Sequence, residues 1–350
     1  MKKLLLLLLI PIYSVQAQMS DSLKKYYSYI NSAEIAIYDS NYSEAEKLYD
    51  LGFNYKKHPF LVDVYNLTLV YAIQKKHKKV YENLKKLADF NYPISKFEDE
   101  VVFTIFADFY RSKYGKRIIK YAENPNYSFN LNLRKTYDSL LVVDQYFRKK
   151  EGSYKVYGDT IYKIDKSNVE LMYKLIAQYG FPSEDLIGTS FGFSYNQFNI
   201  IVSHNHPNVS NKLMTYDFHE LLLSAIISGA INNRKGANLI ETNAGYSYYG
   251  INSFGKIHHY RITPIEFYIP KPEEGIYGYF PIKEDDKELV QELNKKREEI
   301  GLPTIEERRK AFKLGINTLF LLSDGGMIGF DVTEADYEKI VEKIIQIKYQ

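Results

Sequence analysis

Apolar residues recur at three- and four-residue intervals through the first third of this chain, and this helical period restricts its fold more than any other feature. Asp39-Ser40-Asn41 interrupts the period, so the pattern predicts two paired helices and not one long helix. Ser43, with Glu46 three residues later, matches a capping box and is predicted to open the second helix. The first apolar face comprises Leu23, Tyr26, Tyr27, Ile30, Ala33 and Ile37, and the second comprises Ala45, Leu48, Tyr49 and Phe53.

A second helical pair repeats the first at an offset of 35 residues, which aligns Ala45 with Val80. Residues 22–93 resemble the tetratricopeptide family, whose repeat is about 34 residues long. The second copy departs from the family because Val80 stands where a small residue is usual. The resemblance implies a concave surface for peptides or partner domains, and a structural brace is the equal alternative. The matching small and aromatic positions are Ala33, Tyr42, Ala45 and Tyr49.

A third helical pair is predicted from a further capping box, Ser95 with Glu98, and from an apolar face between Val101 and Tyr110. Each repeat in such a stack covers only its neighbours, so a short stack leaves one helix face uncovered. We therefore expect that face to pack on the second half of the chain.

Residues 1–17 are typical of a secretory signal peptide, with Lys2 and Lys3 before an apolar run and Val15-Gln16-Ala17 at the cleavage position. The run is shorter than the ~20 apolar residues of a membrane-spanning helix. No cysteine follows it for lipid attachment. We expect an exported protein, periplasmic or extracellular, without a stable membrane anchor after cleavage.

The chain contains no cysteine at all, which excludes disulfides, thiolate metal sites and cysteine nucleophiles. It has 46 Lys and Arg against 43 Asp and Glu, and loss of Lys2 and Lys3 with the signal peptide leaves 44 against 43. A nearly neutral chain lacks the positive field on which nucleic-acid binding depends. We expect no nucleic-acid partner.

A helix predicted over residues 131–149 carries the first chemically informative side chains. At ~100° per residue, Asp144 and Arg148 fall inside its apolar arc and, four residues apart, can pair. A charged pair on a buried face costs desolvation energy unless further partners hold it. The pair therefore marks either a structural clamp or a pocket. The arc itself comprises Leu133, Tyr137, Leu140, Val143 and Phe147.

An ordered set of short patterns continues from this helix. Its members are Asp144-Gln145-x-x-Arg148, Asp165-x-x-Asn168, Tyr179-Gly180-Phe181-Pro182, His204, Tyr249-Gly250 and Asn294-x-x-Arg297. Together they make residues 133–310 similar to the bacterial family called domain of unknown function 6624. That family has no assigned reaction, so the resemblance implies architecture and candidate positions alone.

This chain departs from the family at three polar places: Ser203-His204 stands for Gln-His, Glu241-Thr242 for Asp-Arg, and Gly250-Ile251-Asn252 for Gly-Thr-Gln. If those residues form a site, this copy has altered it. The candidate polar pocket that we infer comprises Asp144, Gln145, Arg148, His204 and Tyr249.

Ser203-His204-Asn205-His206-Pro207 is the sharpest chemical pattern in the chain. On a strand, His204 and His206 share a face and could bind one zinc ion. The pattern is similar to the core of the JAMM/MPN metallopeptidases, although Phe218 stands where that family has its aspartate. On a helix the two imidazoles point ~200° apart and cannot share a metal. The sequence leaves strand and helix open over residues 196–206.

The predicted fold is mainly α. Tetratricopeptide-like helical hairpins over residues 22–123 pack on a helical domain over residues 131–350, which also carries small antiparallel β elements. One of these is a hairpin over residues 154–163 that turns at Gly158-Asp159. The predicted function is a non-enzymatic binding or scaffold protein without a cofactor, which contacts proteins or peptides through the helical repeats. The alternative is a zinc-dependent hydrolase that uses His204 and His206.

Overall fold

The computed structural model describes residues 18–95, 100–189, 197–205, 216–244, 249–250, 254–259, 276–279, 287–308, 320, 326–330 and 345–346. The predicted signal peptide, Glu98 of the third capping box, and His206 lie outside these residues. No helix in the described part is long and apolar enough to cross a membrane.

The described chain is mainly α-helical, as the sequence predicted. Its helices are α1 (Asp21–Tyr38), α2 (Tyr42–Phe53), α3 (Leu61–Ile73), α4 (His77–Asp89), α5 (Glu100–Arg111), α6 (Lys113–Ala122), α7 (Leu131–Arg148), α8 (Ser153–Tyr179), α9 (Glu184–Ile187), α10 (Gln197–His204), α11 (His219–Ile227), α12 (Asn233–Ala244) and α13 (Lys287–Glu299).

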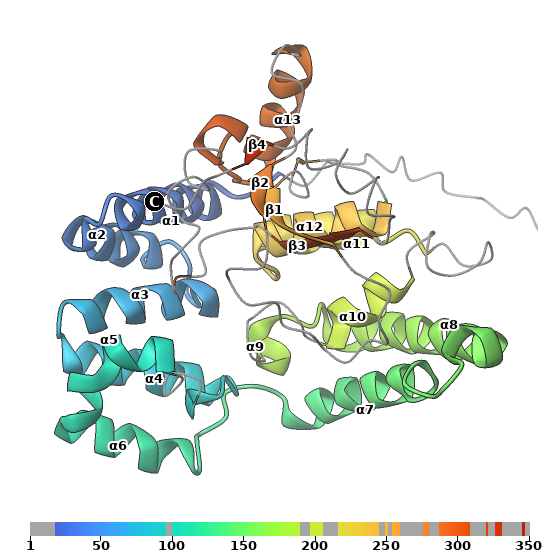
Figure 1. Ribbon diagram of the computed structural model, residues 1–350, viewed down its shortest axis with the longest axis horizontal. Helices are drawn as coiled ribbons and strands as arrows, with labels where there is room; N and C mark the ends of the chain where they lie inside the picture. The colour runs from blue at the N-terminus through green and yellow to red at the C-terminus, as the bar shows by residue number, and fades with distance from the viewer. Residues whose placement is uncertain are drawn as a thin grey trace, which may run out of the picture.

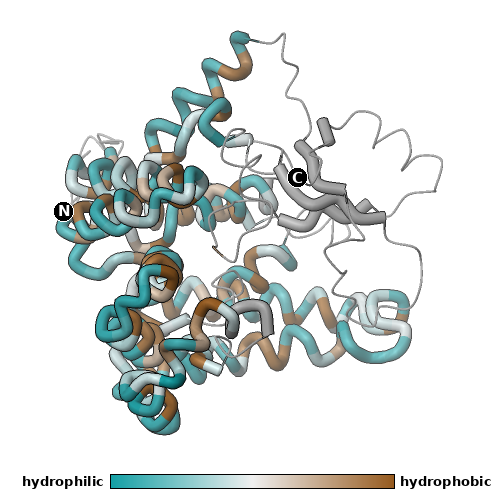
Figure 2. Tube along the Cα trace, turned by 60° about the vertical axis from the view of Figure 1, so that its left-hand side comes forward, coloured by the Kyte–Doolittle hydropathy of each residue, from teal (hydrophilic) through white to brown (hydrophobic). Residues whose placement is uncertain are grey.

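The first six helices form three pairs: α1 packs on α2, α3 on α4, and α5 on α6. The pairs follow one another along one side of the molecule (Figure 1). Hydrophobic and hydrophilic residues alternate along these helices, as expected where one face is buried (Figure 2). Helix α3 differs because eleven of its 13 residues are buried, which places it at the centre of the packing.

The 35-residue repeat extends from the side-chain pattern to the backbone. Ser40 and Lys75, which follow α1 and α3, have positive φ angles of 56° and 57°. In both turns the next N–H donates to the carbonyl five positions earlier, over 2.8 Å to Ala36 and 2.9 Å to Tyr71. This left-handed cap satisfies carbonyl groups that the end of a helix leaves unpaired. Each first helix therefore ends in the same way before the chain reverses.

The predicted capping box at Ser43 and Glu46 is wrong. Helix α2 begins at Tyr42, and the side chain of Asn41 accepts the cap hydrogen bond from the N–H of Glu44 at 3.2 Å. The carboxylate of Glu46 instead pairs with the ammonium groups of Lys76 and Lys79, the latter at 2.8 Å. Burial raises the pKa of Glu46, but hydrogen bonds from the two lysines outweigh it and the pKa is lowered.

Later parts of the chain cover the inner face of the helical pairs, as expected for a short stack. The hydroxyl of Tyr27 accepts from the N–H of Asn233 at 3.1 Å, and Asn31 donates to the carbonyl of Gly301 at 3.2 Å. The N–H of Leu61, at the start of α3, donates to the carboxylate of Glu184 at 2.9 Å. A single hydrophobic core runs through both halves, from Met19 to Leu302.

The predicted hairpin over residues 154–163 is wrong, because these residues belong to α8. Gly158-Asp159 is a turn signal only when the flanking residues pair as strands, and here helical packing of α8 on α7 overrides it. Where the structure describes side chains it contains no strand, so it gives the predicted antiparallel β elements no support there.

Four short strands are described at the level of the backbone: β1 (Phe254–His259), β2 (Ile276–Tyr279), β3 (Gly326–Phe330) and β4 (Ile345–Gln346). They form one sheet in the order β3-β1-β2-β4. Strand β1 pairs with β2 antiparallel and with β3 parallel, and β2 pairs with β4 antiparallel. The sheet is therefore mixed.

Candidate functional site

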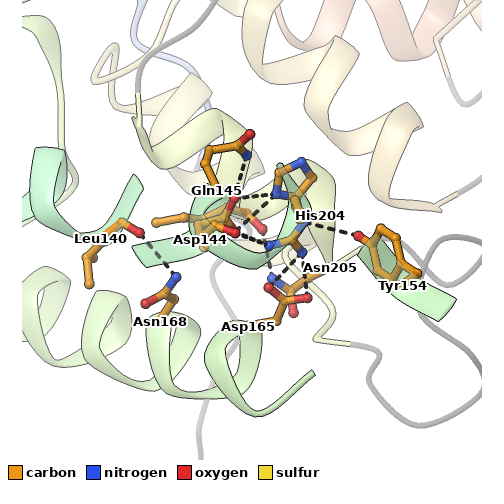
Figure 3. Close-up of polar contacts among 10 residues, drawn as sticks. Leu140, Asp144, Gln145, Tyr154, Asp165, Asn168, His204 and Asn205 are labelled. Carbon is orange, nitrogen blue, oxygen red and sulfur yellow. Dashed lines mark hydrogen bonds and ion pairs between the residues drawn. The ribbon is translucent and has the colours of Figure 1, made fainter. Parts of the chain in front are cut away.

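Three helices bring three buried charged side chains and a partly exposed histidine together (Figure 3). Helix α7 contributes Asp144 and Arg148, α8 contributes Asp165, and α10 contributes His204. Asp144 and Arg148 lie one helical turn apart on the face of α7 that packs against α8 and α10. We call these four residues the α7–α8–α10 network.

Arg148 is the centre of the network, and every nitrogen of its guanidinium group is used. Nη2 donates to both carboxylate oxygens of Asp165 at 2.7 Å. Nη1 donates to the backbone carbonyl of Asp144 at 2.7 Å and lies 3.0 Å from Oδ1 of the same residue. Nε donates to the hydroxyl of Tyr154 at 3.0 Å. Because all three nitrogens donate, these charge-assisted hydrogen bonds hold the guanidinium group in one orientation.

The ionisation of the central pair follows from burial and from the neighbouring charges. Burial lowers the pKa of Arg148, but the hydrogen bonds to Asp165 and the charges of Asp144 and Asp165 outweigh it, so this pKa is raised. Burial raises the pKa of Asp165, and the nearby carboxylate of Asp144 adds to the rise against the opposing effect of Arg148. The arginine therefore stays charged and holds two carboxylates.

Asp144 links this arrangement to His204. Its side chain is 1% exposed, and its carboxylate oxygens lie 3.0 Å and 2.8 Å from Nδ1 of His204. Gln145 donates to Oδ2 of Asp144 at 2.7 Å. A carboxylate that receives these contacts acts as an acceptor, so we assign the proton of the neutral imidazole to Nδ1.

The other ring nitrogen of His204 is the open end of the network. It points away from Asp144 (Figure 3), and the side chain is 25% exposed. With Nδ1 protonated, Nε2 carries a lone pair that can accept a hydrogen bond or a proton, and it becomes a donor when the ring is charged. The site can therefore orient a polar ligand at one imidazole edge.

The structure brings four of the five predicted pocket residues together: Asp144, Gln145, Arg148 and His204. Tyr249 contributes no described contact to the network. Its backbone N–H donates to Glu241, and its carbonyl accepts from Arg297 at 2.7 Å. Glu241 and Arg297 therefore hold the backbone of Tyr249 on both sides.

Sequence reasoning missed Asp165 and Tyr154 as members of the site. Asp165 belongs to the pattern Asp165-x-x-Asn168, and both residues are buried on α8. Asn168 donates to the carbonyl of Leu140 on α7 at 3.4 Å. The predicted hairpin over residues 154–163 misplaced Tyr154, and no local pattern shows that α8 packs on α7 with Asp165 facing Arg148.

The strand that would let His204 and His206 share a metal ion is not formed at His204, because this residue ends helix α10. Asn205 follows in a turn, and its side chain donates to the carbonyl of Ile201 at 2.7 Å. Among the described residues, no group of three or more His, Asp or Glu side chains is placed to hold a metal ion.

Comparison with protein-family models, with curated proteins and with solved structures found no match to this chain.

Proposed function

We propose that this chain is a non-enzymatic binding and scaffold protein. In this proposal the helical pairs, together with the C-terminal helices, form the scaffold, and the imidazole edge of His204 is where a protein or peptide is contacted. One observation carries the proposal: a buried carboxylate fixes one nitrogen of His204, while the other nitrogen has no partner among the described residues and the side chain is 25% exposed.

The helical pairs support the scaffold part of the proposal. We assign them to a tetratricopeptide-like arrangement, because the turn geometry recurs after 35 residues and the first pair carries small and aromatic residues at positions typical of that repeat. Ala33, Ala45 and Tyr49 are fully buried, as such helix pairs require. The inner faces of α1 and α3 hold Asn233, Gly301 and Glu184 of the same chain. A partner would therefore reach the protein elsewhere than on these two faces.

We further propose that the protein is exported to the periplasm or the extracellular space and that residues 133–310 belong with the family they resemble. Export is supported by the basic and apolar pattern of residues 1–17. Stability without disulfides is supported by the continuous core. No reaction follows from either proposal.

A peptide selection tests the binding proposal directly. Random peptides displayed on phage are selected against the chain from residue 18 onward, and each selected peptide is titrated by calorimetry. We expect His204→Gln to weaken binding about tenfold, as loss of an oriented hydrogen bond to a charged or polar group would. The matched control is His58→Gln, whose imidazole is half exposed and 4.0 Å from Asp185.

The proposal would be contradicted if the selected peptides bound His204→Gln as tightly as the unaltered protein, or if the selection yielded no binder. Zinc content of the purified protein is measured alongside. Stoichiometric zinc that disappears in His204→Gln would favour the hydrolase alternative over the binding protein, and the zinc-free protein would then lose its activity on test peptides.

A further inference from the structure

Three aromatic rings surround the ammonium group of Lys150 at the turn between α7 and α8. Nζ of Lys150 lies 4.4 Å from the ring centre of Tyr146, 4.9 Å from that of Phe147 and 5.6 Å from that of Tyr157. Each distance is within the range of a cation–π interaction. The described residues offer this ammonium group no carboxylate partner, so the rings are its environment.

The three rings are inclined to one another and do not form a parallel stack. Tyr146 and Phe147 are 4.9 Å apart and nearly perpendicular, at 89°. Phe147 and Tyr157 are 5.1 Å apart and inclined at 46°. Rings set at an angle present more than one π face to the same point, which a flat stack cannot do. We call Tyr146, Phe147 and Tyr157 the aromatic cage.

The turn that follows Lys150 has an unusual backbone next to the cage. Gly152 has a φ of 80°, and a Cβ there would lie 2.4 Å from Cγ2 of Val156. Ser153, a residue with a Cβ, also has a positive φ of 32°. Tyr157 interrupts α8 with φ −113° and ψ 15°. Of these three residues only Ser153 has a strained dihedral, and such dihedrals persist where the surroundings impose them, often at ligand sites.

We propose that the aromatic cage is a binding site for a small quaternary ammonium ion and that Lys150 is its internal occupant. Aromatic cages recognise such ions because their charge is spread over methyl groups and faces several rings at once. A primary ammonium is a compact and strongly hydrated charge, so it competes weakly for the same position. The site is accessible, since Tyr146 is 56% exposed and Lys150 is exposed.

The aromatic cage is separate from the binding site proposed at His204. The ring nearest to the guanidinium of Arg148 that is described is Tyr154, at 5.7 Å, which lies outside the cage. No residue of the cage belongs to the α7–α8–α10 network. Either proposal can fail alone.

Choline is the probe, and its binding to the full protein is followed by NMR through the trimethylammonium signal. We expect saturable binding that tightens about fivefold in Lys150→Ala, because the internal competitor is gone. The control Lys149→Ala removes an exposed lysine with no described ring contact and leaves the affinity unchanged. Both substitutions lie beyond the last residue of α7, so neither endangers the fold.

Two further measurements isolate the π contribution. The neutral carbon analogue of choline has the same shape without the charge, and we expect it to bind about fivefold more weakly. Tyr146→Leu keeps an apolar side chain at an exposed position and should weaken choline by a similar factor. Equal affinity for choline and its neutral analogue, or no saturable choline binding in Lys150→Ala, would overturn the proposal.

Discussion

Two ionic clusters in this protein differ in the group at their more exposed end, which is the guanidinium of Arg234 (side chain 16% exposed) in the first and the imidazole of His204 (25% exposed) in the second. The first joins the helical pairs to α12: Arg234 donates to both carboxylate oxygens of Glu34, at 2.6 Å and 2.5 Å, and to Asn31 at 3.0 Å. The second is the α7–α8–α10 network, which ends at the partly exposed imidazole of His204. Both fix helices relative to one another.

The comparison shows how a structural ion pair can be told from a candidate binding site. Glu34 is 4% exposed and is held across 200 positions of sequence, so this contact serves the packing of the two halves. Asp144 is also buried, but its partner His204 is 25% exposed and has a second ring nitrogen that Asp144 does not contact, whereas Arg234 uses two nitrogens on the two oxygens of Glu34. A buried ionic cluster is weak evidence for function by itself, and its open end is what makes it a candidate site.

The largest expected effect comes from removing the two central arginines. Arg148→Met leaves Asp144 and Asp165 buried without their cation, and Arg234→Met does the same to Glu34. Breaking a buried pair costs about 3–5 kcal/mol of unfolding free energy, and we expect Arg148→Met to cost more because two carboxylates lose their partner. Urea denaturation measures both. Losses below about 1 kcal/mol would show that neither cluster fixes the helices.

The next effect is a pH dependence confined to the inner face of the helical pairs. Asp63 on α3 is 2% exposed and receives a hydrogen bond from the hydroxyl of Tyr26. Burial raises the pKa of Asp63 from 3.8 to about 7. Because the folded state holds this proton more tightly than the unfolded state, its stability falls as pH rises from about 4 to about 7.

The loss at neutral pH is roughly 2–4 kcal/mol, since each pKa unit corresponds to ~1.4 kcal/mol. Asp63→Asn removes the titrating proton and keeps an acceptor for Tyr26, so its stability should fall less over the same interval. Unfolding free energies at several pH values compare the two proteins. Parallel pH profiles would mean that Asp63 does not titrate in this interval.

A smaller change in stability distinguishes a glycine that packs against α1 from a glycine in α8 that has open space around it. Gly301, which follows α13 as a helix-ending glycine should, has φ +70°, and a Cβ there would lie 2.8 Å from the ring of Tyr27. Gly301→Ala should therefore cost about 1–3 kcal/mol. Gly158→Ala in α8 meets nothing within 4 Å, and it should stabilise by about 0.5–1 kcal/mol. Thermal unfolding of the pair tests this, and equal shifts would contradict the packing at Tyr27.

The smallest stability change is expected for His204→Gln. The imidazole is partly exposed, and Asp144 keeps Arg148 and Gln145 when the ring is removed. We expect a loss below about 1 kcal/mol, in contrast to Arg148→Met. If His204→Gln unfolds the protein as readily as Arg148→Met does, the histidine is part of the brace and not an open end.

Local periodicity predicted much of this molecule because a helix turns by a fixed angle per residue. The same angle placed Asp144 and Arg148 inside the apolar arc of residues 131–149, where the structure has them buried. It could not supply Asp165, since the turn at Gly152 and the packing of α8 on α7 decide which residue meets Arg148. Nor could it pair Glu34 with Arg234, because neither side chain belongs to a local pattern that names a distant partner.

Turn signals were the least dependable, for a physical reason. Gly158-Asp159 fits a hairpin, but a helix tolerates both residues when its other positions pack well. Ser43 and Glu46 fit a capping box, but two lysines bind the Glu46 carboxylate instead. At Gly158 the packing of α8 on α7 overrode the turn preference, and at α2 the nearby Asn41 supplied the cap in place of Ser43.

The tautomer of His204 tests the central claim most directly. Long-range proton–nitrogen NMR of the imidazoles, recorded where the ring is neutral, reports which nitrogen carries the proton. The account predicts the proton on Nδ1, facing Asp144, and a shift toward the Nε2 tautomer in Asp144→Asn. A neutral His204 protonated on Nε2 in the unaltered protein would contradict it, because the ring edge offered to a ligand would then not be the one described.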